Sequence, residues 1–350
     1  MSFSKQLIYW YLQNERDLPW RKTKNPYFIW LSEIMLQQTR VRQGLSYYLA
    51  FTKMFPTVFD LANASEAVVL KLWQGLGYYS RARNLHASAK FIANELNGVF
   101  PSTYHDIKML KGVGDYTASA ISSICFDEVQ AVVDGNVYRV LARYFGIATP
   151  INSTKGIKEF KALAQTLIDP AHPGTYNQAV MDFGALHCKP HNPLCDTCFL
   201  STSCAALKEN TVKLLPVKEK KIKVKKRYFN YLVCVSDSHE TLFLERKGKG
   251  IWQGLYQFPL LETSRSMCID EIEQHADLKE YVDSPVNITL FNEKEVVHKL
   301  SHQHLYTRFW IVKSMRLKGN VIPWNTIESY PTPQLIANFL EKFNPSNGYF

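Results

Sequence analysis

Four of the chain's seven cysteines stand within seventeen residues, and this crowding constrains the fold more than any other feature. Their spacing is C-x6-C-x2-C-x5-C, and they are Cys188, Cys195, Cys198 and Cys204. In a reducing compartment such clustering indicates metal ligands rather than disulfides. Four thiolates can enclose zinc or a 4Fe–4S cluster. Zinc sites more often pair two C-x2-C knuckles and only one is present, so the spacing favours iron–sulfur, in a loop that the metal would stabilise.

The length, apolar runs and net charge of the chain limit the classes of protein to which it can belong. The length of 350 residues is enough for two or three domains. Charged residues interrupt "MSFSKQLIYWYLQNERD", and no apolar run reaches the ~18 residues of a membrane helix. We therefore expect no secretory signal, no membrane contact and a cytoplasmic protein. The net charge of +10 favours a polyanionic partner, although a merely soluble basic protein explains the charge equally well.

The hydrophobic pattern and the composition of the sequence change along the chain. Up to Cys204, apolar residues recur at three- and four-residue spacing, which predicts a mainly helical region over 1–215. Residues 218–227 hold six Lys and one Arg against one Glu, which favours a solvated linker over 216–227, with a phosphate-binding track as the alternative. From Tyr228, short β-branched and aromatic runs such as "YFNYLVCV" predict an α+β domain over 228–350. The isolated Cys125, Cys234 and Cys268 are expected to be small buried hydrophobes.

The segment "LKGVGDYTASAISSI" predicts a hairpin between two helices at about 103–124. Gly112 and Gly114 flank Val113 and permit a tight turn whose backbone N–H groups point outward at a helix N-terminus. That geometry binds phosphate without reading base sequence. G-x-G alone is equally typical of an ordinary turn, so the flanking helices carry the prediction.

Two carboxyl residues have contrasting surroundings. Glu33 lies among apolar residues on nearly every side in "FIWLSEIML", so we expect burial to raise its pKa and let it act as a general acid; the alternative is a solvated Glu. Asp134 ends an apolar run before a helical pattern, where it is either a plain N-cap or a carboxylate kept ionised by the helix. Cleavage of a bond to an anomeric carbon uses such a pair.

The order of motifs along the chain closely resembles that of MutY-type adenine DNA glycosylases. The motifs are L-P-W-R, S-E-x-M-L-Q-Q-T, G-L-G-Y-Y-x-R-A-R-N-L, G-V-G-x-Y-T-A, V-x-D-G-N-V-x-R-V and the cysteine loop. These glycosylases belong to the helix–hairpin–helix superfamily that includes endonuclease III. The resemblance covers nearly all of residues 1–215. It implies a helix–hairpin–helix glycosylase fold with an iron–sulfur loop at 188–204, one 4Fe–4S cluster, and an intracellular, nucleoid-associated monomer.

The resemblance also implies roles for individual residues. Glu33 would protonate adenine N7, and Asp134 would stabilise the deoxyribosyl cation. The remaining carried-over residues are supporting catalytic residues (Tyr116, Asn136), adenine-pocket residues (Trp20, Arg21, Gln178, with Arg16 a weaker candidate) and a wedge beside the mispair (Gln38, Tyr78). Bifunctional relatives place a Lys where this chain has Tyr116, so the resemblance implies a monofunctional enzyme that leaves an abasic site.

The C-terminal region resembles the nudix-like domain with which these proteins inspect 8-oxoguanine, most clearly in "GKGIWQGLYQFPL". Ser301 and His302 are assigned to the lesion base, and Leu300 stands where the family usually has Phe. A catalytic nudix helix of the form R-E-x-x-E-E is missing, since Glu271 and Glu273 lack the preceding Arg-Glu. This domain is therefore expected to bind and not to hydrolyse.

The sequence thus predicts an enzyme that flips adenine out of A:8-oxoguanine or A:G mispairs in double-stranded DNA and hydrolyses its glycosidic bond. Three alternatives were weighed. Tyr116 and the extra domain oppose an endonuclease III-like enzyme for oxidised pyrimidines. Glu33, Asp134 and Tyr116 together oppose a catalytically silent, metal-bearing DNA-binding protein, because binding alone needs no such set. The missing Glu-rich helix opposes a nudix hydrolase with a helical appendage.

Overall fold

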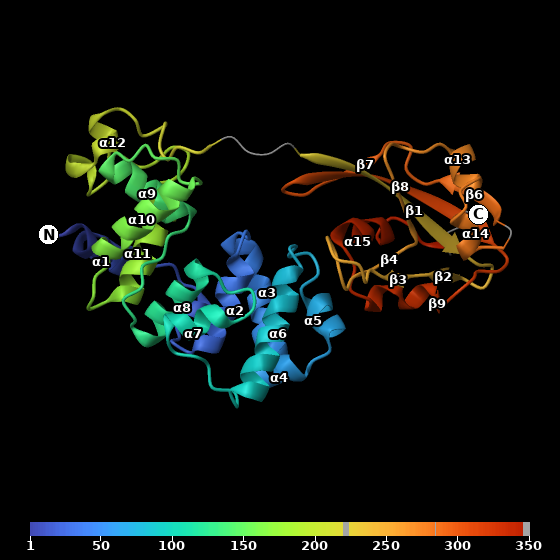
Figure 1. Cartoon of the computed structure of the whole chain (residues 1–350), viewed down its shortest axis with the longest axis horizontal. Helices are drawn as coiled ribbons and strands as arrows, with labels where there is room; N and C mark the ends of the chain where they lie inside the picture. Colours follow the sequence, from blue (N-terminus) through green and yellow to red (C-terminus); the bar gives the residue numbers. More distant parts are fainter. Residues whose placement is uncertain (220–223, 284, 346–350) are drawn as a thin grey trace. The chain divides into compact units, whose positions relative to one another are not determined.

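The computed structural model describes residues 1–219, 224–283 and 285–345 (Figure 1). It divides into two compact units. The first comprises Met1–Asn63 and Asn84–Lys220, and the second comprises Ala64–Arg83 and Lys221–Phe350. No helix among the described residues is long and apolar enough to cross a membrane.

The first unit is helical, as the sequence predicts. Its helices are α1 (Phe3–Asn14), α2 (Pro26–Leu36), α3 (Val41–Met54), α4 (Val58–Asn63), most of α6 (Ser80–Glu95), α7 (Tyr104–Met109), α8 (Asp115–Phe126), α9 (Gly135–Phe145), α10 (Thr154–Leu167), α11 (Pro173–Leu186) and α12 (Ala205–Lys208). Side-chain caps fix several starts: Asn25 caps α2 and Thr103 caps α7. Helix α11 packs on α1, α8 and α9, which makes it the central helix of this unit.

The second unit is built on a seven-stranded sheet of order β6-β8-β1-β2-β9, with β5 also paired to β1 and β7 to β8. The strands are β1 (Lys225–Val235), β2 (Glu240–Leu242), β5 (Leu260–Thr263), β6 (Pro285–Leu290), β7 (Val296–Lys299), β8 (Gln303–Ser314) and β9 (Val321–Pro323). A separate pair is formed by β3 (Leu244–Glu245) and β4 (Tyr256–Gln257). Strands β1 and β8 are parallel, and the other pairs are antiparallel.

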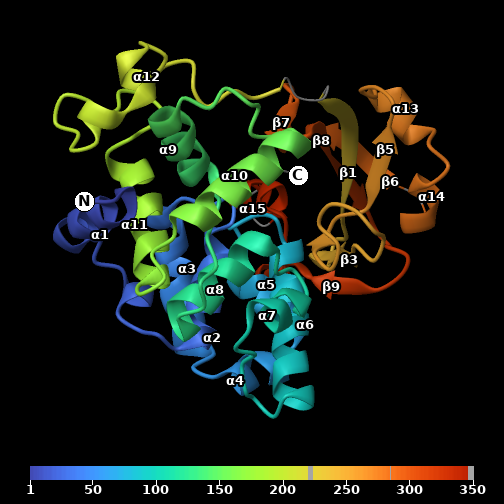
Figure 2. The ribbon, with the colours of Figure 1, turned by 60° about the vertical axis from the view of Figure 1, so that its left-hand side comes forward.

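Alternating side chains place two cores on the two faces of this sheet. On one face, Phe309 of β8 stacks on Phe339 of α15 (Gln334–Leu340) with ring centroids 4.2 Å apart. On the other, Leu232 and Trp310 belong to a core formed with α13 (Ile269–Glu273) and α14 (Leu278–Tyr281). Figure 2 shows β1, β5, β6 and β8 side by side with these two helices next to them. The mixed α+β composition expected for this region is confirmed.

Two expectations were wrong in detail. Cys268 is exposed at the N-cap of α13, whereas Cys234 is buried in the core as expected. The C-terminal boundary of the linker expected over 216–227 was placed too far along the chain, because Lys225–Arg227 already belong to β1 and pair with β8. Residues 220–223 of that linker lie outside the described residues.

The segment Ala64–Arg83 groups with the second unit although it precedes most of the first. It contains α5 (Glu66–Leu72). Lys71 donates to the carbonyl of Glu328, and Arg83 donates to the carbonyl of Gln253 across 2.6 Å. The amide oxygen of Gln74 accepts from the Thr332 N–H at 3.2 Å. The sequence offered no sign of this grouping, because it depends on polar contacts across more than 150 residues of chain.

Candidate active site and DNA-binding surfaces

Glu33 sits in α2 and is 9% exposed, so the expected desolvation is confirmed. The pKa of Glu33 is raised to about 7, chiefly by burial and also by the charge of Asp134, although a hydrogen bond from Tyr116 and the charge of Arg21 act in the opposite direction. A carboxyl with such a pKa holds its proton near neutral pH. That is the state required of a general acid.

Asp134 is the N-cap of α9, as its position in the sequence predicts. Its Oδ1 accepts from the backbone N–H groups of Asn136 and Val137, each at 2.8 Å, and its Oδ2 accepts from Asn136 Nδ2 at 2.7 Å. Burial raises the pKa of Asp134 above its usual value, and the three donors offset only part of this rise. The carboxylate is therefore both desolvated and held in a fixed orientation.

The two carboxyl groups line one cavity of about 460 Å³ in the first unit. The structure thus brings together residues that are separated by about 100 positions in the sequence. Seven residues proposed from the sequence as catalytic or adenine-binding line this cavity, as does the weaker candidate Arg16: Trp20, Arg21, Glu33, Tyr116, Asp134, Asn136 and Gln178. A cavity with two carboxyl groups, a guanidinium and an indole can accept a planar heterocycle with hydrogen-bonding edges.

Sequence reasoning missed Asp182, which holds one wall of this cavity in place. Asp182 is fully buried in α11, and its Oδ1 accepts from Arg21 Nη2 at 2.7 Å and also from Arg16. Tyr11 donates to Gln178 Oε1 at 2.5 Å and accepts from Arg21 at 3.2 Å. The signal for Asp182 was available, because "AVMDFGAL" encloses a carboxyl in apolar residues just as the Glu33 segment does.

The predicted hairpin is present between α7 and α8. Gly112 has φ of +82°, and a Cβ there would lie 2.7 Å from Cβ of Asn84, so only glycine fits. A Cβ on Gly114, the N-cap of α8, would meet nothing within 4 Å, so there is open space beside the start of this helix. Asp115, an unexpected acid here, is paired with Lys108 and Lys161, and these lysines lower its pKa.

The four clustered cysteines are all free thiols and line one cavity of about 40 Å³. Arg143 donates to Cys188 Sγ at 3.4 Å and to the carbonyl of Lys189 at 2.8 Å, so a cationic side chain faces the sulfur group. Among the described residues, no three His, Cys, Asp or Glu side chains are placed to hold a single metal ion. The four thiol groups that line this cavity are a donor set that can hold zinc or a 4Fe–4S cluster.

Arg139 connects the loop of cysteines to the active-site cavity. Its Nε donates to the carbonyl of Cys188 at 2.8 Å, and its Nη2 donates to Asn136 Oδ1 at 2.8 Å and to the carbonyl of Gly184 at 2.6 Å. Asn136 in turn donates to Asp134. The orientation of Asp134 therefore depends on the fold of the loop that carries the cysteines.

The two residues proposed as a wedge share an unusual backbone conformation. Gln38 has φ of +56° and Tyr78 has φ of +48°, in the left-handed region that non-glycine residues rarely adopt. Such strain is concentrated at functional sites. Within the second unit, the Tyr78 hydroxyl is hydrogen-bonded to the Ser301 hydroxyl. Ser301 and His302 are exposed in the turn that joins β7 to β8.

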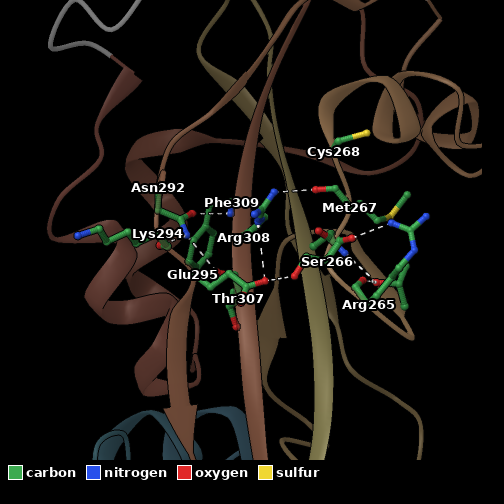
Figure 3. Close-up of polar contacts among 12 residues, drawn as sticks. Arg265, Ser266, Met267, Cys268, Asn292, Lys294, Glu295, Thr307, Arg308 and Phe309 are labelled. Carbon is green, nitrogen blue, oxygen red and sulfur yellow. Dashed lines mark hydrogen bonds and ion pairs between the residues drawn. The ribbon is translucent and has the colours of Figure 1, made fainter.

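The segment where a nudix hydrolase would hold metal is occupied by internal contacts. Glu271 pairs with Arg265 and accepts from the backbone N–H of Cys268 at 2.9 Å, and these contacts lower the pKa of Glu271 to about 2. In Figure 3, Glu295 lies between Ser266 and Arg308, and Arg308 points to the carbonyl of Met267. The carboxylates are thus used to fix the loop.

These features define the class of protein. The first unit is helical and contains a helix–hairpin–helix, a cavity with two carboxyl groups and a loop with four cysteines. This is the arrangement of a base-excision repair glycosylase. The family model described as "HhH-GPD superfamily base excision DNA repair protein" matches residues 31–166, and the model described as "NUDIX domain" matches residues 230–342. The chain belongs to the adenine DNA glycosylases, with a nudix-like C-terminal domain.

The family assignment rests on relatives along the whole chain. The chain is 35% identical to the adenine DNA glycosylase of Buchnera aphidicola subsp. Baizongia pistaciae, over 98% of this chain and 97% of that protein. It is 45% identical to the human adenine DNA glycosylase, over 59% of this chain and 39% of that protein. Among solved structures, a thermostable thymine-DNA glycosylase is 30% identical with a TM-score of 0.55, over 59% of this chain and 95% of that chain. An endonuclease III–DNA complex is 20% identical with a TM-score of 0.52, over 59% of this chain and 94% of that chain, and supports the fold alone.

Proposed function

We propose that this protein removes adenine mispaired with 8-oxoguanine or guanine from double-stranded DNA. The single observation that carries the proposal is the cavity that joins Glu33, protonated near neutral pH, with Asp134 held by three N–H donors. A cavity of about 460 Å³ is large enough for one base turned out of the helix. Extrusion is needed because the glycosidic bond is inaccessible within the stack.

In the proposed reaction, Glu33 donates its proton to N7 of the extruded adenine. The bond between C1′ and N9 then breaks, and its electron pair passes to the base. Asp134 faces the positive charge that develops on the sugar and stabilises it. Because N7 already carries the proton, adenine leaves as a neutral base. A water molecule then adds to C1′ and passes its proton to the Glu33 carboxylate, which restores the acid and leaves an abasic site. Tyr116 hydrogen-bonds Glu33, the charge of Arg21 acts on Glu33 from nearby, and Asn136 holds Asp134.

The absence of a lysine nucleophile at position 116 supports a monofunctional enzyme. Tyr116 lies in the cavity with its hydroxyl 3.2 Å from Met181 Sδ, and a phenol cannot form a Schiff base with the sugar. We therefore propose that the protein leaves the DNA backbone intact. Strand breaks should form only after alkali is added.

We also propose that Cys188, Cys195, Cys198 and Cys204 hold one 4Fe–4S cluster, which when bound supplies four strong bonds that fix the loop. This chain's own Arg139 and Arg143 connect that loop to α9. The second unit is proposed to recognise 8-oxoguanine through Ser301 and His302, with Tyr78 as the wedge that Ser301 orients. Gln38 would serve as the partner wedge in the first unit.

The decisive experiment is single-turnover base release from duplexes with adenine opposite 8-oxoguanine, guanine or thymine, with and without alkali. Fast release opposite 8-oxoguanine, little or none opposite thymine, and breaks only after alkali are expected. Glu33→Gln should retain mispair binding and lose base release. Release by that variant at the wild-type rate would remove Glu33 from the mechanism, and no release by iron-replete wild-type protein would overturn the proposed function.

A further inference from the structure

One face of the sheet extends beyond the helices that cover it. Side chains at even-numbered positions of β1 and β8 share this face, because register pairs Lys226 with His304 and Tyr228 with Tyr306. Farther along, Leu232 and Trp310 on the same face are covered by α13 and α14. In Figure 1 the start of β1 and the strand β7 lie at the end of the sheet away from these helices.

The uncovered end carries a compact set of aromatic and cationic side chains. The rings of Tyr228 and Tyr306 stack with centroids 5.2 Å apart and an interplanar angle of 25°. Lys226 Nζ lies 5.7 Å from the Tyr306 centroid. From the neighbouring β7, Val297 pairs with Tyr306 and Lys299 with His304. We call this set the sheet-end surface: Lys226, Tyr228, Val297, Lys299, His304 and Tyr306.

A row of polar contacts separates the sheet-end surface from the apolar core. Arg308, the next residue on this face of β8, donates to the carbonyl of Met267 at 2.7 Å and lies 3.9 Å from Glu295 (Figure 3). Glu295 also accepts from Ser266. The carboxylate of Glu295 is therefore already paired with Ser266 and Arg308. The six residues of the sheet-end surface carry two lysines and no acid, and both lysines are exposed.

We infer that the sheet-end surface binds the sugar–phosphate backbone of the duplex next to the lesion base. Lysine ammonium groups and tyrosine hydroxyls are common donors to DNA phosphates. The inference rests on the proposed function, because it takes the position of the DNA from Ser301 and His302. These two residues form the turn at which β7 ends and β8 begins, so they are continuous with this surface.

Strand geometry sets the reach of this contact. Tyr306 follows His302 by four residues, or about 13 Å along an extended strand. One DNA strand advances about 3.4 Å per nucleotide, so the contacted phosphates lie within about four nucleotides of the lesion base. A duplex shortened to two base pairs on that side of the lesion should therefore lose the contact with Tyr306, whereas contacts with residues nearer to His302 should remain.

The test uses the full chain carrying Lys226→Gln and Lys299→Gln together. Binding to an A:8-oxoguanine duplex is measured against salt concentration, and single-turnover release is measured at saturating protein. Each lost phosphate contact lowers the salt slope by about 0.9. We expect a slope lower by one to two such contacts, weaker binding, and unchanged release at saturation. The matched control is Lys279→Gln on α14, an exposed lysine on the helix covering the other end of this face.

A second variant separates the contact from folding effects. Tyr228→Phe with Tyr306→Phe preserves the ring stack and removes only the hydroxyls, and it should weaken binding by a fewfold with an unchanged melting temperature. A wild-type salt slope in the lysine variant, with base release intact, would overturn the inference and leave the proposed function standing. Failure of the wild-type protein to release adenine would instead refute the proposed function, on which the inference depends.

Discussion

Asn136 donates a hydrogen bond to Asp134 across 2.7 Å, from Nδ2 to Oδ2, while its own Oδ1 accepts from Arg139 Nη2 at 2.8 Å. Asn136 therefore connects the Arg139 guanidinium to the Asp134 carboxylate. The consequence for the proposed reaction is that Asn136 orients the Asp134 carboxylate and favours its ionised form.

Replacing Asn136 with Ala should slow base release. Loss of a hydrogen bond to a charged group costs about 1.5–3 kcal/mol, or about 10- to 100-fold in rate. Because the Asn136 side chain lowers the pKa of Asp134, and alanine keeps only the backbone N–H at this position, the loss of the Nδ2 donor should also move the acidic limb of the rate–pH profile upward. Single-turnover release from pH 4.5 to 9 measures both effects. Asn14→Ala, at an exposed site on α1, is the control, and an unshifted acidic limb would contradict the proposed role.

Glu33→Gln should stabilise the fold in alkaline solution. The pKa of Glu33 is raised by burial from 4.5 to about 7. The protonated group's contribution to stability is therefore fully present below about pH 4.5 and is lost as pH rises through about 7. Glutamine stays neutral throughout, so the advantage of the variant should grow by about 2.5 kcal/mol between pH 5 and pH 8. Melting temperatures at both values test this, and a constant difference would contradict a buried Glu33.

Tyr116→Phe should move the alkaline limb of the rate–pH profile. The Tyr116 hydroxyl hydrogen-bonds Glu33 and lowers the pKa of that carboxyl. Phenylalanine removes the donor and keeps the ring, so the pKa of Glu33 should rise above about 7 and release should persist to higher pH. The profile is measured by single-turnover release. A limb that moves to lower pH would show that Tyr116 acts on Glu33 in another way.

The sequence was most informative where local chemistry decides the outcome. The N-cap at Asp134, the glycine turn at Gly112 and the apolar surroundings of Glu33 each depend on neighbours within a few residues. The strands of the second unit were also predictable from their alternating aromatic and β-branched residues. A general-acid role for Glu33 and a pairing with Asp134 were proposed from their surroundings, whereas the reaction on adenine and the roles of the other site residues came only from the family resemblance.

Long-range polar contacts were not predictable. The grouping of Ala64–Arg83 with the second unit depends on single hydrogen bonds such as that from Arg83 to the carbonyl of Gln253. The stacked Tyr228 and Tyr306 needed the parallel register of β1 and β8, which no local pattern specifies. Cys268 was misjudged because its apolar neighbour Met267 is buried, whereas Cys268 itself caps a helix at the surface.

Asp182→Ala should destabilise the first unit. Asp182 is fully buried and pairs with Arg16 and Arg21. Removing one partner of a buried ion pair leaves an uncompensated charge and costs about 3–5 kcal/mol. Asp17→Ala is the matched control, because Asp17 and Lys22 form an exposed pair worth at most about 1 kcal/mol. Thermal unfolding compares the two, and equal losses would mean that the Asp182 cluster contributes no more than a surface pair.

Cys198→Ser should reduce bound iron and destabilise the loop, whereas Cys268→Ser should change neither. Cys198 lines the cavity formed by all four clustered cysteines, and Cys268 is exposed in the second unit. Serine is a much weaker iron ligand than thiolate, so the proposed cluster would lose one of four bonds. Because Arg139 links the carbonyl of Cys188 to Asn136, base release should fall together with iron content. Iron per chain, visible absorbance and single-turnover release are measured on the same preparations. Full iron with normal release in the Cys198 variant would exclude that thiol as a ligand, and zinc in place of iron in the wild-type protein would overturn the proposed cluster.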